Sequence, residues 1–353
     1  MAQSRVSKDK AITYAEQSDF AFQAIAKATS LETPISLDEL MTYSITSVPS
    51  ALGTPDGFFA KTNKATIVHH LSDEYLAPRP PEEEVFHIED GNAVFHAMTN
   101  IPGTFKGIAL KLLDQSAKKK SMIFSTDSYH ENSPKAHELR RRSGPTQLPP
   151  IVLSGENMKR PADFKLFMTV DENKISMCKT ILKVWSSSEA AKKLMNRDVY
   201  LVVEGHLYHF TSDGEEVTVV EEEDYLTTHE ETDHKIILYL KLISNLLTNN
   251  QQKNKVIIRS PDSDVFIKLL YYSHYYQELT LIMDTGTGDS RRLIDVSELA
   301  RDKGKDLCKS IPGFYVFTGE DTTSAFKGKG KVQPFKKLLT YPRYSLFVNS
   351  IKC

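Results

Sequence analysis

The sequence predicts an α/β fold in which a central, mostly parallel sheet is flanked by helices. One sign is the β-branched run Val256-Ile257-Ile258, which is typical of a buried strand and leads into Arg259-Ser260-Pro261-Asp262-Ser263-Asp264. A second sign is the order strand, helix, strand: the apolar segment 85–92 precedes helical patterns, and another apolar segment follows at 121–127. Such alternation favours a parallel sheet, whose functional residues gather at the carboxyl ends of the strands.

Composition indicates a globular protein with neither a membrane span nor a disulfide framework. The chain has 353 residues, 40% hydrophobic and 25% charged, which suits one large domain or two ordinary ones. Its formal net charge of −2 creates no global field that would require a nucleic-acid partner. The cysteines, Cys178, Cys308 and Cys353, are few and widely separated, which indicates a reducing compartment. No apolar run approaches the roughly 20 residues that span a bilayer, so we expect an intracellular protein, nuclear or cytoplasmic, with no membrane partner.

Residues 1–84 are expected to form an appendage of unknown role, in front of a main domain over residues 85–353. A helical pattern runs from 14 to 28, and Ser36-Leu37-Asp38-Glu39-Leu40 is typical of a capped helix start. Prolines and glutamates between 77 and 84 indicate a linker or an exposed loop.

Further periodic segments complete the expected main domain. Asp213-Gly214 is typical of a hairpin turn between two strands. The other expected helices are 93–98, 104–116, one opened by 229–234, 265–276 and 296–308, and the other expected strands are 166–170, 199–204, 207–211, 216–220 and 279–283.

Acidic residues recur at the predicted strand ends, at one helix start and in the loops beside them. They are Asp90, Asp127, Glu231, Asp233, Asp262, Asp264 and Asp321. A D-x-D pair is often an ordinary Asx turn, and acids in the first turn of a helix suit the helix dipole. If the acids converge, their charges would repel unless cations neutralised them. Mg²⁺ or Mn²⁺ prefers oxygen ligands, and two such ions about 4 Å apart can activate water and stabilise a leaving oxygen in phosphodiester cleavage.

The segment His229-Glu230-Glu231-Thr232-Asp233-His234 differs from the zinc motif H-E-x-x-H. Its second histidine is one position too late, so the two imidazoles are not expected to share a helical face. We therefore reject a zinc-protease interpretation.

Two basic segments have two interpretations, a phosphate-binding site and a solvated surface, and the residues alone leave both open. Lys135 and the run Arg140-Arg141-Arg142 fall on a predicted helix after Asp127. Near the C-terminus, Lys327-Gly328-Lys329-Gly330-Lys331 joins a glycine turn to lysines, and backbone N–H groups in such a turn can hold a phosphate.

The order of these motifs resembles the PIN-like fold of the flap-endonuclease and XPG nuclease superfamily. Asp90 and Asp127 look like the family's first two catalytic aspartates. The segment from Lys135 to Arg142 is similar to its K-x-x-E-L-x-x-R helix, and Glu231-Thr232-Asp233 is similar to its E-A-E pair. Asp233 stands where the family has the second glutamate of that pair, so the side chain is shorter but its charge is the same.

The C-terminal half carries the rest of the resemblance. Asp262-Ser263-Asp264 is similar to the family's T-x-D-x-D segment. Gly319-Glu320-Asp321 and Gly328-Lys329-Gly330 are similar to a G-x-D…G-x-G element that opens a helix–two-turn–helix DNA-binding motif. The strings S-P-D-S-D and D-T-T-S-A-F-K-G-K-G-K also look like those of transposon-associated PIN-like proteins. The resemblance covers roughly residues 85 to 340, and residues 143–225 depart from it where the family has its arch.

This resemblance implies a PIN-like (FEN/XPG-type) sheet flanked by helices, with a helix–turn–helix-like DNA-binding element over 318–341. It implies that Lys135 and Arg142 contact the scissile phosphate, while Arg140, Arg141 and residues 327–331 bind nucleic acid. One ion would be held by Asp90, Asp127 and Glu231, and the other by Asp233, Asp262, Asp264 and Asp321.

Three functions are therefore weighed. The first is a structure-specific, two-metal nuclease that uses Mg²⁺ or Mn²⁺, with DNA favoured over RNA as its partner. The second is a catalytically inactive nucleic-acid-binding or protein-interaction module on the same fold. The third is a phosphatase or nucleotidase that uses the same metals on small substrates.

Overall fold

The computed structural model divides into two compact units, which are treated separately below. One unit is Leu71–Lys305, and the other joins Met1–His70 to Asp306–Cys353. The division therefore falls after His70 and after Lys305, whereas the sequence suggested a boundary after residue 84. The structure describes residues 19, 21–30, 35–40, 42, 51–54, 58–129, 149–247 and 254–340.

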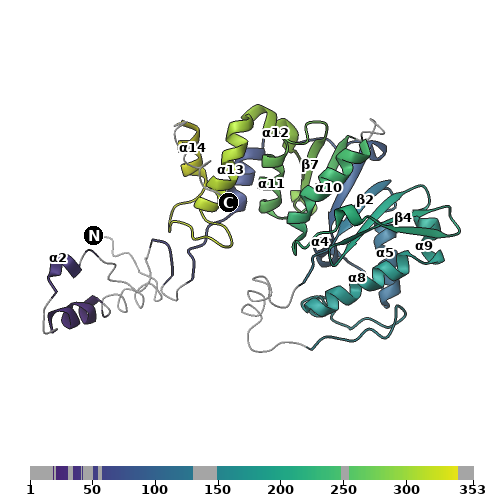
Figure 1. The fold of residues 1–353 in the computed structure, drawn as a ribbon, viewed down its shortest axis with the longest axis horizontal. Coiled ribbons are helices and arrows are strands. Elements are labelled where there is room, and N and C mark those ends of the chain that lie inside the picture. Colours follow the sequence, from purple (N-terminus) through teal and green to yellow (C-terminus); the bar gives the residue numbers. More distant parts are fainter. Residues whose placement is uncertain are drawn as a thin grey trace. The chain divides into compact units, whose positions relative to one another are not determined.

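The Leu71–Lys305 unit is built on one eight-stranded sheet in the order β5-β4-β3-β2-β1-β6-β7-β8 (Figure 1). The central strands β3, β2, β1, β6 and β7 are parallel to one another, while β4, β5 and β8 pair antiparallel with their neighbours. The mixed α/β fold with a mostly parallel sheet is thus confirmed. The strands are β1 (Val85–Asp90), β2 (Ser121–Ser125), β3 (Asp198–Val203), β4 (His206–Ser212), β5 (Val217–Glu221), β6 (Lys255–Arg259), β7 (Thr280–Thr285) and β8 (Arg292–Asp295).

Helices fill most of the connections between these strands. In the Leu71–Lys305 unit they are α4 (Gly91–Ala97), α5 (Phe105–Gln115), α7 (Phe164–Phe167), α8 (Asp171–Trp185), α9 (Ser188–Leu194), α10 (Thr232–Leu247), α11 (Ser263–Tyr272) and α12 (Val296–Lys303), with short 3₁₀ turns η1 (Glu82–Glu84), η2 (Glu223–Tyr225) and η3 (Gly288–Ser290). The remaining helices are α2 (Leu37–Leu40), α3 (Ala65–Ser72), α13 (Lys305–Phe317) and α14 (Val332–Thr340).

The helices lie in two layers, one on each face of the sheet. Phe124 of β2 packs in a large apolar cluster with Trp185 of α8, at a ring separation of 6.0 Å. Its neighbour Ser125 instead hydrogen-bonds to the Tyr239 hydroxyl of α10, at 3.1 Å. Because successive strand residues face opposite sides of a sheet, α8 and α10 cover opposite faces.

The strand order reverses beside β1, and this reversal fixes where a site can form. From β1 the chain moves outward through β2 and β3, and it later returns to the other side of β1 to form β6 and β7. The carboxyl ends of β1 and β6 therefore meet at a topological switch point, which is where ligands bind in open α/β sheets.

Three expectations about individual elements were wrong. Residues 166–170 do not form a strand, because Asp163 caps the short helix α7 by accepting a hydrogen bond from the N–H of Leu166 at 2.8 Å. The expected helix 296–308 is two helices, broken at Gly304, whose φ of +80° favours glycine. Strand β8 was not expected at all.

Among the described residues, no helix has the length and apolarity required to cross a membrane.

Candidate functional site

Asp90 stands at the carboxyl end of β1 and begins helix α4. Its Oδ1 accepts hydrogen bonds from the N–H groups of Asn92 and Ala93, at 3.0 and 3.2 Å, as an N-cap does. Gly91 follows, where a Cβ would lie 2.7 Å from a ring carbon of Phe124 and 2.8 Å from the carbonyl oxygen of Ser125. Only glycine fits at this distance, so the first turn of α4 lies directly against the end of β2.

The pKa of Asp90 responds to the charges of two acids that follow other strands. Burial raises the pKa of Asp90, and the negative charges of Asp127 and Asp262 raise it further, to about 6 from the usual 3.8. Two backbone hydrogen bonds favour the ionised form, but they do not outweigh these effects. The carboxylates that follow β1, β2 and β6 thus lie at the same edge of the sheet, near the switch point, and we call Asp90, Asp127 and Asp262 the strand-end acids.

Asp127 is held by the start of helix α10. Its Oδ1 accepts a hydrogen bond from the N–H of Thr232 at 2.9 Å, and the N–H of Ser128 donates to the carbonyl oxygen of Glu230 at 2.7 Å. These two hydrogen bonds join the loop after β2 to the start of α10. They are made by the residues on either side of Glu231, which is thereby held near that loop.

Lys235 reinforces this junction and was missed from the sequence. Its side chain is fully buried, and its ammonium donates hydrogen bonds to the carbonyl oxygen of Thr126 at 2.8 Å and to the hydroxyl of Ser128 at 2.9 Å. The helical spacing could have revealed it, since Lys235 shares the buried stripe of α10 with Thr232 and Tyr239. A buried lysine normally requires such partners.

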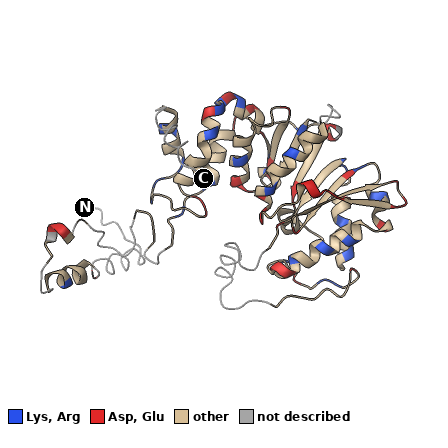
Figure 2. Ribbon diagram, in the orientation of Figure 1, with Lys and Arg blue, Asp and Glu red and all other residues tan. Residues whose placement is uncertain are grey.

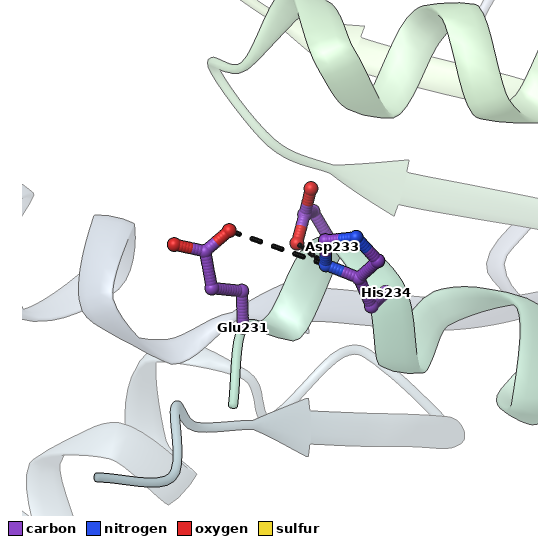
Figure 3. Close-up of side chains that lie close together, drawn as sticks. All are labelled: Glu231, Asp233 and His234. Carbon is purple, nitrogen blue, oxygen red and sulfur yellow. Dashed lines mark ion pairs between the residues drawn. The ribbon is translucent and has the colours of Figure 1, made fainter. Parts of the chain in front are cut away.

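Glu231, Asp233 and His234 form a second cluster at the start of α10 (Figure 3). Each offers a ligand atom, and these atoms lie within 4.8 Å of one another. His234 Nδ1 lies 2.9 Å from Asp233 Oδ1 and 4.0 Å from Glu231 Oε2. Asp233 also forms an ion pair with Lys268 of α11. Burial raises the pKa of Asp233, but the hydrogen bond from His234 and the charge of Lys268 outweigh it and hold the pKa well below its usual range.

The two histidines of the His229–His234 segment lie close together, although they do not share a helical face. Their ring centroids are 5.7 Å apart and the planes are inclined by 21°. The reason is that α10 begins only at Thr232, so His229 precedes the helix and is not bound by its geometry.

Asp262 caps helix α11 while it also belongs to the strand-end acids. Its Oδ1 accepts a hydrogen bond from the N–H of Asp264 at 2.9 Å, and its own N–H donates to the Ser260 hydroxyl at 3.2 Å. The D-x-D pair therefore does form an ordinary Asx turn. The carboxylate of Asp262 also acts on the site, because its charge raises the pKa of Asp90.

A buried ion-pair group at the end of β7 supports the Asp262 loop and was also missed. Asp284, which is 4% exposed, accepts hydrogen bonds from Arg259 at 2.9 Å and from Arg291 at 2.9 and 2.5 Å. The carbonyl oxygen of Asp284 accepts from the N–H of Ser260 at 3.2 Å. This group fixes the segment between β6 and Asp262.

The other predicted site residues fall elsewhere. Lys135, Arg140, Arg141 and Arg142 lie outside the described residues. Asp321 belongs to the unit that contains the chain termini, where it forms an ion pair with Lys64 at 2.8 Å.

The residues of the predicted glycine–lysine turn differ in exposure. Lys327, Gly328, Lys329 and Gly330 are exposed. Lys331 is fully buried and donates to the carbonyl oxygens of Tyr315 and Gly319, at 2.9 and 2.6 Å, at the end of α13. Its ammonium serves as a helix cap here, and it would have to leave these acceptors to reach a phosphate.

Comparison with known proteins adds little to this geometry. No family model matches the chain, and no curated protein matches it. Among solved structures, the chain is similar to flap endonuclease-1 from Methanococcus jannaschii, with 13% sequence identity, 79% of this chain and 82% of that chain covered, and a TM-score of 0.35. A likeness at this level carries no argument about activity, so the function is argued from the site.

Proposed function

We propose that this chain is a divalent-metal-dependent nuclease that hydrolyses phosphodiester bonds of DNA or RNA. The observation that carries the proposal is the placement of Asp90, Asp127 and Asp262 after three neighbouring parallel strands at the switch point, and the raised pKa of Asp90 supports it. Carboxylates at one edge of a sheet repel one another, and a cation bound there would relieve this repulsion. Perturbed pKa values of this kind are typical of functional sites.

The donor set suits a hard cation. The strand-end acids offer only oxygen ligands, as Mg²⁺ and Mn²⁺ prefer. Asp264 is two residues after Asp262, and Glu231 precedes Thr232, whose N–H donates to Asp127. A bound ion would activate a water molecule and stabilise the leaving oxygen of a phosphodiester. The protein's own contribution is positioning: Thr232 holds Asp127 by a hydrogen bond, and the helix cap holds Asp262. A second ion, with Asp233 and Asp264 among its ligands, is part of the proposal.

The proposed substrate is nucleic acid, with DNA favoured over RNA. Lys135 and Arg142 are proposed to contact the scissile phosphate, as the resemblance to the flap-endonuclease superfamily implies. Arg140, Arg141 and the exposed part of the segment 327–331 are proposed to bind neighbouring phosphates. We also propose that the protein acts in the nucleus or the cytoplasm.

The deciding experiment measures cleavage of labelled single-stranded, flap and hairpin DNA and RNA. Wild type is compared with Asp90→Asn and Asp262→Asn in Mg²⁺, Mn²⁺ or EDTA, with Asp295→Asn as the control because Asp295 caps α12 through the N–H of Glu298. We expect cleavage only with metal, loss in the first two variants and retention in the control. No cleavage by wild type, with binding intact, would refute the nuclease and favour a nucleic-acid-binding module. Turnover of mononucleotides alone would favour a nucleotidase.

A further inference from the structure

The N-terminal segment contains a small hairpin in the unit that includes both chain termini. The N–H of Thr54 donates to the carbonyl oxygen of Phe58 at 2.8 Å, and the N–H of Ala60 donates to that of Leu52 at 2.9 Å. Gly53 and Phe59 face each other as an antiparallel bridge. We call the paired residues 51–54 and 58–60 the N-terminal hairpin.

This hairpin is joined to the glycine–lysine loop between α13 and α14. The N–H groups of Ala325 and Lys327 donate to the carbonyl oxygens of Ala60 and Ala51, each at 2.8 Å. The N–H of Ala60 also donates to the Ser324 hydroxyl at 3.2 Å. The loop therefore continues the hairpin as a third extended segment, and the two parts of the chain present one surface.

Phenylalanine rings are unusually exposed on this surface. Phe58 is 52% exposed, Phe59 is 50% exposed and Phe326 is 40% exposed. Phe326 packs against Phe317, which is 46% exposed, at a ring separation of 5.4 Å. Phe58 and Phe59 are adjacent in an extended segment and face opposite sides of it, so one of the two rings shares a face with the loop and the other lies on the opposite face. Clustered exposed aromatic rings mark an interaction site more often than scattered single ones do.

The same surface has a local excess of positive charge. The loop Ser324–Lys331 carries three lysines and no carboxylate, in a chain whose formal net charge is −2, and of the three only Lys331 is buried. Lys327 and Lys329 are exposed, and neither forms an ion pair with another residue that the structure describes. In Figure 2 the ribbon is coloured blue at lysines and arginines and red at aspartates and glutamates.

We infer that the N-terminal hairpin and the loop Ser324–Lys331 together form a binding surface for single-stranded nucleic acid. Every unpaired base has a face that can stack on an aromatic ring, and lysines beside the rings hold the backbone phosphates. The bases of a duplex are stacked on one another, so their faces are not free to stack on the exposed phenylalanine rings. This inference extends the proposed function by naming the form of the substrate, and it gives the N-terminal hairpin a role.

The test is binding of a fluorescent single-stranded oligonucleotide and of the matched blunt duplex, measured by anisotropy in EDTA. We expect the double variant Phe58→Ala, Phe59→Ala to bind the single strand about tenfold or more weakly, with duplex affinity unchanged. The double variant Phe58→Leu, Phe59→Leu should lose binding similarly, because leucine keeps apolar area but has no aromatic face. Phe22→Ala is the matched control, since Phe22 is 71% exposed and lies in another part of the same unit.

A second variant set tests the phosphate contacts. Lys327→Ala with Lys329→Ala should weaken binding and lower the salt dependence, by about 0.7 in log–log slope for each lost phosphate contact. Lys192→Ala, an exposed lysine of α9, should bind as wild type does.

Three results would overturn the inference. They are no single-strand binding by wild type, full binding by the Phe58→Ala, Phe59→Ala variant, and equal losses on single strand and duplex. Full binding by the leucine variant would assign the hairpin to an apolar protein contact instead. Because the assay contains no divalent metal, it is independent of cleavage, so failure of the nuclease proposal would leave its result intact.

Discussion

Replacing Asp90 with asparagine should stabilise the metal-free protein at neutral pH, although it removes a residue of the proposed site. The ionised carboxylate is disfavoured in the folded protein by burial and by the charges of Asp127 and Asp262. Asparagine cannot ionise, but its side-chain oxygen can still accept the N–H bonds that begin α4. The substitution therefore removes the electrostatic cost and keeps the helix cap.

The magnitude follows from the pKa. The pKa of Asp90 is about 6 in the folded protein, against an ordinary value of 3.8. Each pKa unit is worth about 1.4 kcal/mol, so the two-unit difference corresponds to about 3 kcal/mol. Because the folded protein binds the proton more tightly, the free energy of unfolding falls as pH rises from about 4 to about 6, and the loss is complete above that window. Asp90→Asn should thus gain about 3 kcal/mol over wild type at pH 8 and less than about 1 kcal/mol at pH 4.

The assay is urea unfolding in EDTA at both pH values, with the control Asp295→Asn. That residue also caps a helix, through the N–H of Glu298 at 2.8 Å, and it should show no gain that grows with pH. Adding Mg²⁺ or Mn²⁺ should stabilise wild type more than Asp90→Asn, because a ligand stabilises only the state that binds it. If Asp90→Asn were less stable than wild type at pH 8, or gained equally at both pH values, the electrostatic argument would be refuted.

Three further substitutions test other parts of the site and fold. Lys235→Met should lower the free energy of unfolding by about 3 kcal/mol in urea, because two charged hydrogen bonds in the core are lost, and an unchanged value would count against its positioning role. Asp262→Asn should lower the pKa of Asp90 from about 6, and a carboxyl titration by ¹³C NMR that stays there would disprove their proximity. Gly205→Ala should cost more than about 1 kcal/mol in thermal unfolding, since its φ is +89° and a Cβ would lie 2.1 Å from a backbone oxygen, whereas Gly103→Ala, with open space around it, should change little.

Local pattern was enough to predict the strands that build the site. The apolar runs gave β1, β2, β6 and β7 to within a few residues, and because these strands are parallel, the acids that follow them lie toward one edge of the sheet. The turn at Asp213-Gly214 was also predicted, and the φ of +102° at Gly214 is one that such a turn requires and glycine readily adopts. These features depend on neighbours in the sequence, which a pattern can capture.

Partners that are distant in the sequence could not be predicted. Lys235 looks like any helical lysine until the fold places it against Thr126, which is 109 positions away. Arg259 and Asp284 become partners only because β6 and β7 are adjacent in the sheet. The error over residues 166–170 is of another kind, because its cause is local: apolar residues suit a strand or a short helix, and the cap from Asp163, three positions before Leu166, favours the helix.

The two clusters of acids differ in how their charge is balanced, and this difference bears on how metal would bind. Asp233 is balanced by the protein itself, since Lys268 and His234 hold its pKa below the usual range. Asp90 forms no ion pair with any residue that the structure describes, and its pKa is raised to about 6. Titratable groups whose environments push their pKa values apart have separate roles. A cation at the strand ends therefore competes only with a proton, which is already lost above about pH 6, whereas a cation at the start of α10 must displace Lys268. Of the two ions in the proposal, the one beside Asp90 should therefore bind first. The ion pair from Asp233 to Lys268 joins α10 to α11, and the second ion would have to replace it.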